Sequence, residues 1–356
     1  MATTRVIANG VEQAVHTWGP VDGIPLLLVH GNCSSGLFWE PFVRTQLGGD
    51  DGPWRVVAPD LRGYGESETA PVDGTRGLRD FADDVAALLD AEGLFPAGTR
   101  PWVGAHSMGG GIVMQLAVDQ PGRVAGLLLE APLSPYGFGG TRDTDGTPTT
   151  EDFAGTGAGA VNPDFVARLA AKDRSGEEPT APRTVLRTAY VSDPSVLGDD
   201  EEAMLDTVLS TATGEDNYPG DAGASQNWPM TGPGTRGVTN AMSPKYFGVA
   251  EALVGLEPKP PVEWVRGDAD VIVSDTSLFD LAYLGQLGVV PGWPGAEECP
   301  PQPMVAQTRA VLERYAAAGG PFTETVLEGC GHSPHLERPA EFLAALERLA
   351  AQGNSR

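Results

Sequence analysis

The sequence predicts an α/β protein with a doubly wound, mostly parallel sheet and an inserted, mainly helical cap. Two observations lead to this expectation. Between residues 24 and 131, continuous apolar runs of strand length alternate with stretches of helical period, as expected for strands buried on both faces of a parallel sheet. That alternation stops near residue 132 and resumes near residue 262. We therefore expect a core formed by residues 1–131 and 262–356 and a cap (lid) formed by residues 132–261.

The first part of the chain predicts an antiparallel hairpin followed by buried strands. Two short alternating segments within residues 4–18 flank Asn9 and Gly10, the dipeptide that best supports a type I′ turn. Residues 24–30 (IPLLLVH) and 54–59 (WRVVAP) then read as two strands of the parallel sheet. An amphipathic helix follows, with apolar residues at helical spacing: Phe81, Val85, Leu88 and Leu89.

A serine between small residues follows the next predicted strand. Residues 101–111, PWVGAHSMGGG, lead from a short apolar run through Ser107 into a helix, and residues 124–130 form a further strand. The small Ala105 and Gly109 let strand and helix approach closely and leave the serine hydroxyl exposed, as in the nucleophile elbow G-x-S-x-G. Ala105 replaces the first glycine of that motif. The motif alone is weak evidence, because many glycine-rich loops contain it by chance.

The predicted cap has no alternation of strands and helices. Residues 132–261 are rich in Gly, Pro, Thr and Asp and contain helical pieces between loops. Asn162 and Pro163 suit the start of one helix, since asparagine caps a helix and proline fits its first position. Apolar residues between 204 and 209 indicate a second helix, and residues 246–254 a third.

The second half of the core places acidic residues and a histidine directly after strands. Residues 262–266 (VEWVR) form a strand that leads to Asp268 and Asp270, and a long loop follows. Residues 322–327 form the last strand, which leads to His332. Helices are expected over residues 305–315 and 340–349.

The composition excludes several classes of partner. The net charge of -25 argues against nucleic acid, whose phosphates require a basic surface, and disfavours anionic membranes. The sequence has no apolar run long enough to span a bilayer, and its first ten residues lack the apolar region of a secretory signal. Three cysteines make no disulfide framework, and no C-x-x-C or H-E-x-x-H spacing suggests a metal. We expect a cytoplasmic protein without a metal or other cofactor; its oligomeric state stays open.

Three polar residues at the ends of strands suggest a catalytic constellation. A serine hydroxyl acts as a nucleophile near neutral pH only with a base within reach and a carboxylate that orients the base. A parallel sheet supplies such groups from the carboxyl ends of its strands. Ser107, Asp270 and His332 occur in that setting and in that order. Asp268 and Glu130 are alternatives to Asp270, and His335, three residues beyond His332, could instead start a helix or lie at the surface.

At this point the chain resembles the α/β-hydrolase family, and in particular its cap-bearing esterase-like and lactonase-like enzymes. That fold requires the order serine, acid, histidine. The matching stretches are LLLVHGN (26–32), VVAPDLRGYGES (56–67), AHSMGGG (105–111), WVRGDADVIV (264–273) and GCGHSPHLERPAEF (329–342). They cover both parts of the predicted core in order, whereas the predicted cap matches none. The departures are Ala105 and an unusually long segment after Asp270.

The resemblance implies a role for each matched residue. Ser107 would be the nucleophile, His332 the general base and then the general acid, and Asp270 the group that orients His332. The backbone N–H groups of Asn32 and Met108 would form the oxyanion hole, which stabilises the negative charge that develops in the transition state. The motif at residues 60–67 looks catalytic, but we interpret it as a structural loop that braces the site.

The function expected from the resemblance is hydrolysis of a small-molecule carboxylic ester or lactone through an acyl-enzyme. A serine nucleophile argues against dehalogenase and epoxide hydrolase chemistry, which needs a carboxylate at that position. Two alternatives stay open: a cofactor-free perhydrolase resembling haloperoxidases, and a non-catalytic small-molecule receptor on the same fold. The identity of the substrate is not predicted.

Aromatic residues near the oxyanion turn and in the cap suggest a roomy apolar pocket for the substrate. The candidates for substrate contacts are Phe38, Trp39, Tyr136 and Trp228, together with Phe138, Tyr246 and Phe247. Each cap aromatic could equally pack inside the cap without touching substrate.

Overall fold

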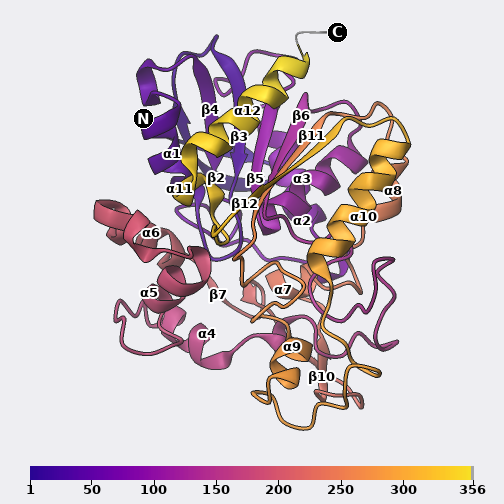
Figure 1. Cartoon of the computed structure of the whole chain (residues 1–356). Helices are drawn as coiled ribbons and strands as arrows, with labels where there is room; N and C mark the ends of the chain where they lie inside the picture. The colour runs from indigo at the N-terminus through magenta and orange to yellow at the C-terminus, as the bar shows by residue number, and fades with distance from the viewer. Residues whose placement is uncertain (354–356) are drawn as a thin grey trace.

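An eight-stranded sheet forms the centre of the computed structural model, which describes residues 1–353 (Figure 1). Its strand order is β1-β2-β4-β3-β5-β6-β11-β12. β2 runs antiparallel to β1 and β4, whereas the other neighbours pair in parallel. The strands are β1 (Ala2–Ala8), β2 (Val11–Trp18), β3 (Ile24–Val29), β4 (Trp54–Pro59), β5 (Trp102–His106), β6 (Gly126–Glu130), β11 (Val262–Gly267) and β12 (Phe322–Leu327). The predicted doubly wound, mostly parallel sheet is confirmed.

The N-terminal hairpin has the predicted turn. Asn9 and Gly10 both have positive φ, 52° and 76°, as a type I′ turn requires. Ala8 pairs directly with Val11 across the two-residue loop. The hairpin places one antiparallel edge on an otherwise parallel sheet, and β1 forms that edge.

Helices cover both faces of the sheet and bury two separate apolar cores. Side chains of a strand alternate between its faces, so Leu26 and Leu28 of β3 belong to one core whereas Leu27 and Val29 belong to the other. The first core includes side chains of α1 (Glu40–Gln46) and α12 (Pro339–Gly353). The second includes side chains of α2 (Arg79–Leu88), α3 (Met108–Asp119), α8 (Ala250–Val254) and α10 (Met304–Ala317). In Figure 1 the two groups of helices lie on opposite sides of the strands.

The order of the strands creates a switch point between β3 and β5. The chain passes from β3 to β4 on one side and reaches β5 on the other side of β3. Ligands of open α/β sheets bind in the crevice outside the carboxyl ends of the strands at such a point. The residues that follow these two strands, 30–33 and 107–108, therefore lie beside each other at the place where a site is expected.

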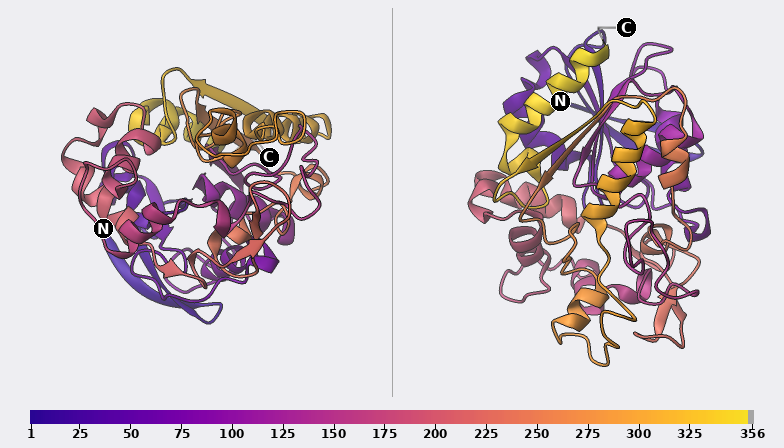
Figure 2. Two further views of the ribbon diagram at one scale, coloured as in Figure 1. Left: turned by 90° about the horizontal axis from the view of Figure 1, so that it is seen from below. Right: turned by 45° about the vertical axis from the view of Figure 1, so that its right-hand side comes forward.

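The segment between β6 and β11 lies mostly beyond the carboxyl ends of the strands (Figures 1 and 2). The helices predicted from Asn162 and from residues 204–209 are present, and the Asn162 side chain accepts a hydrogen bond from the N–H of Asp164. The third predicted helix begins at Ala250 rather than 246 and packs beside the sheet against α3 and α10. The elements of this segment, besides α8, are α4 (Pro163–Ala170), α5 (Pro182–Val185), α6 (Glu201–Leu209), α7 (Val238–Ala241), β7 (Thr213–Gly214), β8 (Tyr218–Pro219), β9 (Ala222–Ala224) and β10 (Thr231–Pro233).

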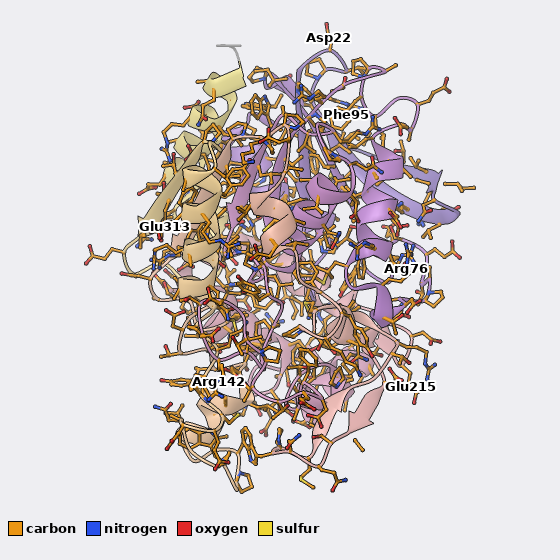
Figure 3. The ribbon with its side chains drawn as sticks, turned by 90° about the vertical axis from the view of Figure 1, so that its right-hand side faces the viewer. Asp22, Arg76, Phe95, Arg142, Glu215 and Glu313 are labelled. Atoms are coloured by element: carbon orange, nitrogen blue, oxygen red, sulfur yellow. The ribbon has the colours of Figure 1, made fainter. Side chains whose placement is uncertain are left out.

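The long connection between β11 and α10 joins the same layer. It contains α9 (Leu281–Gln286), which lies at the end of the molecule farthest from the sheet (Figures 1 and 2). Figure 3 shows Arg142 and Glu215 in this layer, whereas Asp22 and Phe95 lie at the opposite end of the strands. The shorter elements are α11 (Pro334–Glu337), the 3-10 helices η1 (Gly36–Trp39), η2 (Gly49–Asp51), η3 (Gly74–Arg76), η4 (Ala158–Ala160) and η6 (Pro194–Asp200), and the π-helical turn η5 (Leu186–Tyr190). Among residues 1–353, no helix is both long and apolar enough to cross a membrane.

Candidate active site

Ser107 occupies a sharp turn between β5 and α3. Its backbone has φ 54° and ψ -119°, a conformation that is strained for any residue other than glycine. Its N–H donates to the carbonyl oxygen of Glu130 at 2.9 Å and its carbonyl oxygen accepts from Leu133 at 2.9 Å, so the end of β6 supports the turn. A Cβ atom at Gly109 would lie 2.6 Å from the carbonyl oxygens of Val29 and His30. Glycine is therefore required there.

His332 and Asp270 form a buried hydrogen-bonded pair at the same edge of the sheet. Nδ1 of His332 donates to Oδ2 of Asp270 at 2.7 Å. Oδ1 of Asp270 accepts from the backbone N–H groups of Ile272 at 2.7 Å and Val273 at 3.1 Å. Because both oxygens are held, the carboxylate fixes the orientation and the tautomer of the imidazole. The second ring nitrogen, Nε2, is then left to exchange protons with a group in the cavity.

The two alternative acids have other partners. Asp268 accepts from the N–H of Gly329 at 2.7 Å and is exposed. Glu130 accepts from Nδ1 of His335 at 2.8 Å, and both side chains are completely buried. Among the three candidate carboxylates, Asp270 is therefore the one that contacts His332. His335 lies in the first turn of α11, so it does start a helix, but it is buried and is not a surface residue.

Asn32 and Met108 lie where an oxyanion hole would be needed. Both line the same cavity as Ser107 and His332. Met108 is the first residue of α3, so its N–H has no acceptor within the helix. Within residues 1–353, the N–H groups of Asn32 and Met108 donate to no protein acceptor. They are free to donate to an atom in the cavity.

The cavity has a volume of about 370 Å³ and a mostly apolar wall. Its aromatic side chains are Phe138, Phe165, Tyr190, Tyr218 and Phe279. Among the described residues that line the cavity, Asp280 is the one with a carboxylate, and none of them is a lysine or an arginine. The Asp280 carboxylate already accepts from the N–H groups of Ala282 at 3.0 Å and Gln302 at 2.8 Å, and burial raises its pKa. The wall therefore presents no free charge to a ligand.

The structure places four of the predicted substrate contacts outside this wall. Phe38 and Trp39 are completely buried, and their rings pack against His335 at centroid distances of 5.1 and 4.4 Å. Tyr136 lies against Gly146. Trp228 donates from Nε1 to the carbonyl oxygen of Pro291 at 2.9 Å. Of the aromatic residues singled out in the sequence, only Phe138 lines the cavity.

The remaining wall includes two segments that carry no recognisable motif. One is the helical region around α4 and η5, with Val161, Phe165 and Tyr190. The other is the connection after β11, with Leu278 and Phe279. The unusual length of that connection was the one signal in the sequence that pointed to it.

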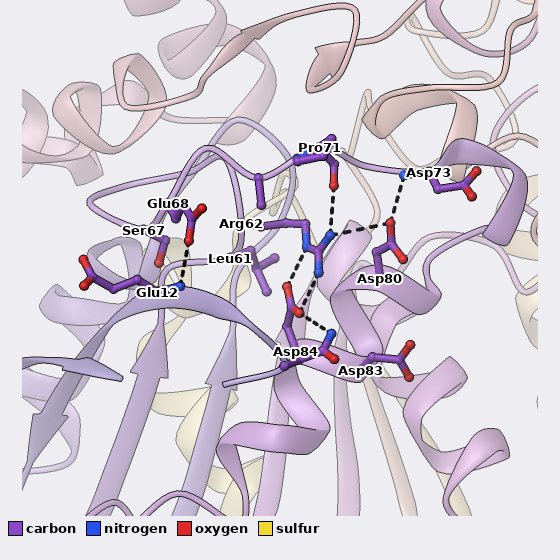
Figure 4. Close-up of polar contacts among 12 residues, drawn as sticks. Glu12, Leu61, Arg62, Ser67, Glu68, Pro71, Asp73, Asp80, Asp83 and Asp84 are labelled. Carbon is purple, nitrogen blue, oxygen red and sulfur yellow. Dashed lines mark hydrogen bonds and ion pairs between the residues drawn. The ribbon is translucent and has the colours of Figure 1, made fainter. Parts of the chain in front are cut away.

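Residues 60–67 form a loop that is held by buried polar contacts, as predicted for a structural loop beside the site. The Asp60 carboxylate accepts from the N–H groups of Gly36 at 2.7 Å and Glu66 at 2.8 Å. Figure 4 shows the Arg62 guanidinium between Asp84 of α2 and the carbonyl of Pro71; its bonds to the two Asp84 oxygens measure 2.6 and 2.7 Å. This loop is thus tied to α2, and it is also tied to β2, where the N–H of Ala14 donates to Oγ of Ser67 at 2.8 Å.

Two further histidines are held neutral. His30 donates from Nδ1 to the carbonyl of Gly31 at 2.7 Å and accepts at Nε2 from the N–H of Leu61 at 3.0 Å. Burial lowers the pKa of His30 to about 4. His106 contacts the carbonyl of His332 at 2.9 Å through Nε2, and burial lowers its pKa well below the ordinary value. Both histidines fix the backbone of the turns around the cavity.

A doubly wound sheet with a strained serine elbow beside its switch point defines the α/β hydrolases as a class of enzyme. The family model described as the alpha/beta hydrolase family matches residues 26–346, so the chain belongs to that family.

Similar proteins include hydrolases and a peroxidase. A putative carbamate hydrolase RutD from Variovorax paradoxus (strain S110) is 40% identical over 111 residues, 31% of this chain and 39% of the relative. A non-heme chloroperoxidase from Streptomyces lividans is 34% identical over 149 residues, 41% of this chain and 50% of the relative. The matched part thus spans half or less of these relatives. The crystal structure of the esterase RhEst1 from Rhodococcus sp. ECU1013 has a TM-score of 0.60 at 20% identity and covers 99% of both chains, a likeness of fold.

Proposed function

We propose that the protein hydrolyses a carboxylic ester or lactone through an acyl-enzyme, with Ser107, His332 and Asp270 as its catalytic triad. The observation that carries the proposal is the 2.7 Å bond between His332 and Asp270 beside a cavity that Ser107 also lines. An oriented imidazole next to an elbow serine is the arrangement that nucleophilic acyl transfer requires.

In the proposed mechanism, Oγ of Ser107 attacks the ester carbonyl carbon while Nε2 of His332 takes its proton. The Asp270 carboxylate stabilises the imidazolium that forms, and the N–H groups of Asn32 and Met108 stabilise the carbonyl oxygen as it becomes an oxyanion. His332 then gives its proton to the departing alcohol. Water, activated by the same imidazole, releases the acid and restores Ser107.

The favoured substrate is a neutral ester or lactone with a medium-sized apolar group. The apolar wall and the lack of a free charge on it support this choice, because burying an unpaired charge is costly. We also propose that residues 132–261 act as the cap, and that the connection after β11 contributes a second part of it, since Leu278, Phe279 and Leu284 line the cavity.

A second candidate function is perhydrolysis, in which hydrogen peroxide replaces water and the acyl-enzyme yields a peracid. The likeness to the non-heme chloroperoxidase from Streptomyces lividans favours it. Peroxide-dependent oxidation of bromide in the presence of a carboxylic acid, lost in Ser107→Ala, would support this reading.

The proposed function is tested by intact-mass spectrometry after incubation with a fluorophosphonate, together with hydrolysis of p-nitrophenyl esters from short to long acyl chains. One adduct on Ser107 and turnover of at least one ester are expected. Ser107→Ala should lose both, while Ser195→Ala, a change at an exposed serine of η6, should keep both. Turnover that survives in Ser107→Ala would refute the proposal. A wild-type protein with neither adduct nor turnover would favour the receptor alternative.

A further inference from the structure

Tyr190 reaches from the segment between β6 and β11 to the turn that follows β3. It is the last residue of the π-helical turn η5 and is buried. Its hydroxyl lies 3.1 Å from the carbonyl oxygen of Asn32 and 2.9 Å from that of Cys33. A phenol has one proton, so the two carbonyls share it in a three-centre hydrogen bond. The ring also lies edge-on to His332, with centroids 6.3 Å apart.

Tyr64 holds the same turn through the side chain of Asn32. Its hydroxyl donates to Oδ1 of Asn32 at 2.7 Å, and its ring packs edge-on against His30 at 5.3 Å. Tyr64 belongs to the bracing loop that Arg62 ties to Asp84. The backbone carbonyl and the side chain of Asn32 therefore both accept hydrogen bonds from phenol hydroxyls that come from distant parts of the chain.

The turn needs such support because regular structure does not supply it. Residues 30–35 belong to no strand or helix. Cys33 has φ 48°, a left-handed conformation that costs a residue with a side chain on the order of 1–3 kcal/mol. The N–H and the C=O of Asn32 flank the same Cα atom, so holding the carbonyl restricts where the N–H points.

We propose that Tyr190 is a positioning residue for acyl transfer: its hydroxyl holds the Asn32–Cys33 turn so that the Asn32 N–H points at the developing oxyanion, with Tyr64 as the matching support on the Asn32 side chain. This inference rests on the proposed function and assigns a new residue to it. Burial raises the pKa of both phenols well above the ordinary value, so both stay protonated donors throughout the neutral range.

The test compares three variants that each remove one hydroxyl and keep the ring. Tyr190→Phe and Tyr64→Phe remove the supports of the turn. Tyr246→Phe is the matched control, because its hydroxyl also donates to a backbone carbonyl, that of Gly234 at 2.9 Å, but the residue does not line the cavity. The readouts are the second-order rate of Ser107 labelling by a fluorophosphonate, and kcat and KM for the best p-nitrophenyl ester.

A displaced oxyanion donor acts on the transition state, so kcat and the labelling rate should fall together by roughly 10- to 100-fold in Tyr190→Phe, with KM changed less than about twofold. Tyr64→Phe should show the same pattern with a smaller loss. Tyr246→Phe should keep the wild-type values. Thermal unfolding of all three variants separates this effect from a general loss of stability.

Three results would overturn the inference: a wild-type labelling rate in Tyr190→Phe, a loss that resides only in KM, or equal losses in Tyr190→Phe and Tyr246→Phe. If Tyr190→Phe does not fold, Tyr64→Phe decides the question by the same criteria. If the wild type is labelled by the fluorophosphonate and both Tyr190→Phe and Tyr64→Phe are labelled at the same rate, only the positioning role is refuted. A wild-type protein that is neither labelled nor active refutes the proposed function, and the positioning role with it.

Discussion

Glu130 and His335 form a second buried carboxylate–histidine pair close to the first. Oε1 of Glu130 accepts from the backbone N–H of His335 at 2.6 Å and from its Nδ1 at 2.8 Å. The His335 ring lies 5.9 Å from that of His106, which in turn lies 4.6 Å from that of His332. The two pairs have the same chemistry, but only His332 lines the cavity. They should therefore respond to mutation in opposite ways.

Asp270→Asn is expected to lower kcat by about 10³- to 10⁴-fold with a small change in stability, because the amide favours the wrong imidazole tautomer. Glu130→Gln should instead lower the free energy of unfolding by about 1–3 kcal/mol while kcat changes less than about fivefold. Urea unfolding and ester hydrolysis of both variants test this contrast. A large loss of kcat in Glu130→Gln would show that Glu130 takes part in catalysis.

Leu278→Trp should shorten the acyl chains that the protein accepts. Leu278 lines the cavity and is 45% exposed, so a larger ring can narrow the opening without disturbing the interior. We expect kcat/KM for an octanoate ester to fall about tenfold relative to that for an acetate ester. Leu287→Trp, at a similarly exposed position outside the cavity wall, is the control. Equal effects of both changes on chain-length preference would contradict the assignment of this opening.

The free energy of unfolding should decrease as the pH falls, and protonation of His30 should account for part of that decrease. Its pKa is about 4 in the folded protein and about 6.5 in an unfolded chain. Between these values the unfolded chain binds a proton that the folded protein does not, so the free energy of unfolding decreases as the pH falls. His30 should account for about 2–3 kcal/mol between pH 7 and pH 4.5.

This pH dependence is measured by urea unfolding of the wild type and of His30→Asn at several pH values. The variant should be less stable at pH 7 but should lose less stability on acidification. Parallel curves for the two proteins would mean that His30 does not contribute to the slope.

Arg62→Met should strongly destabilise the fold. The change leaves the Asp84 carboxylate buried without its two bonds to the guanidinium, which typically costs about 3–5 kcal/mol. Arg44→Ala is the control, since its ion pair with Glu40 at 3.0 Å is exposed and should contribute at most about 1 kcal/mol. Denaturant unfolding of both variants gives the comparison. If the bracing loop also supports Tyr64, Arg62→Met should lose labelling of Ser107 as well.

Several parts of the fold could be predicted because they depend on neighbouring residues. The positive φ angles of Asn9 and Gly10, the Asn162 cap and the elbow around Ser107 each arise within a few consecutive residues. The short strands β7 to β10 were not predicted, since two or three residues carry no readable period. The aromatic residues of the cavity wall were not predicted either, apart from Phe138, because an aromatic residue in a loop looks the same whether it faces a cavity or a core.

The sequence by itself determined the class of fold, the family, and the order of serine, acid and histidine along the chain. These follow from hydrophobic period, turn chemistry and short motifs, which are local properties. Only the tertiary structure decided which carboxylate contacts His332 and which aromatic rings line the cavity. It also decided that Tyr190 donates a hydrogen bond to Asn32, from which it is separated by 158 positions of sequence. The physical reason is that such contacts depend on how separate elements pack on the sheet, and no local pattern records that packing.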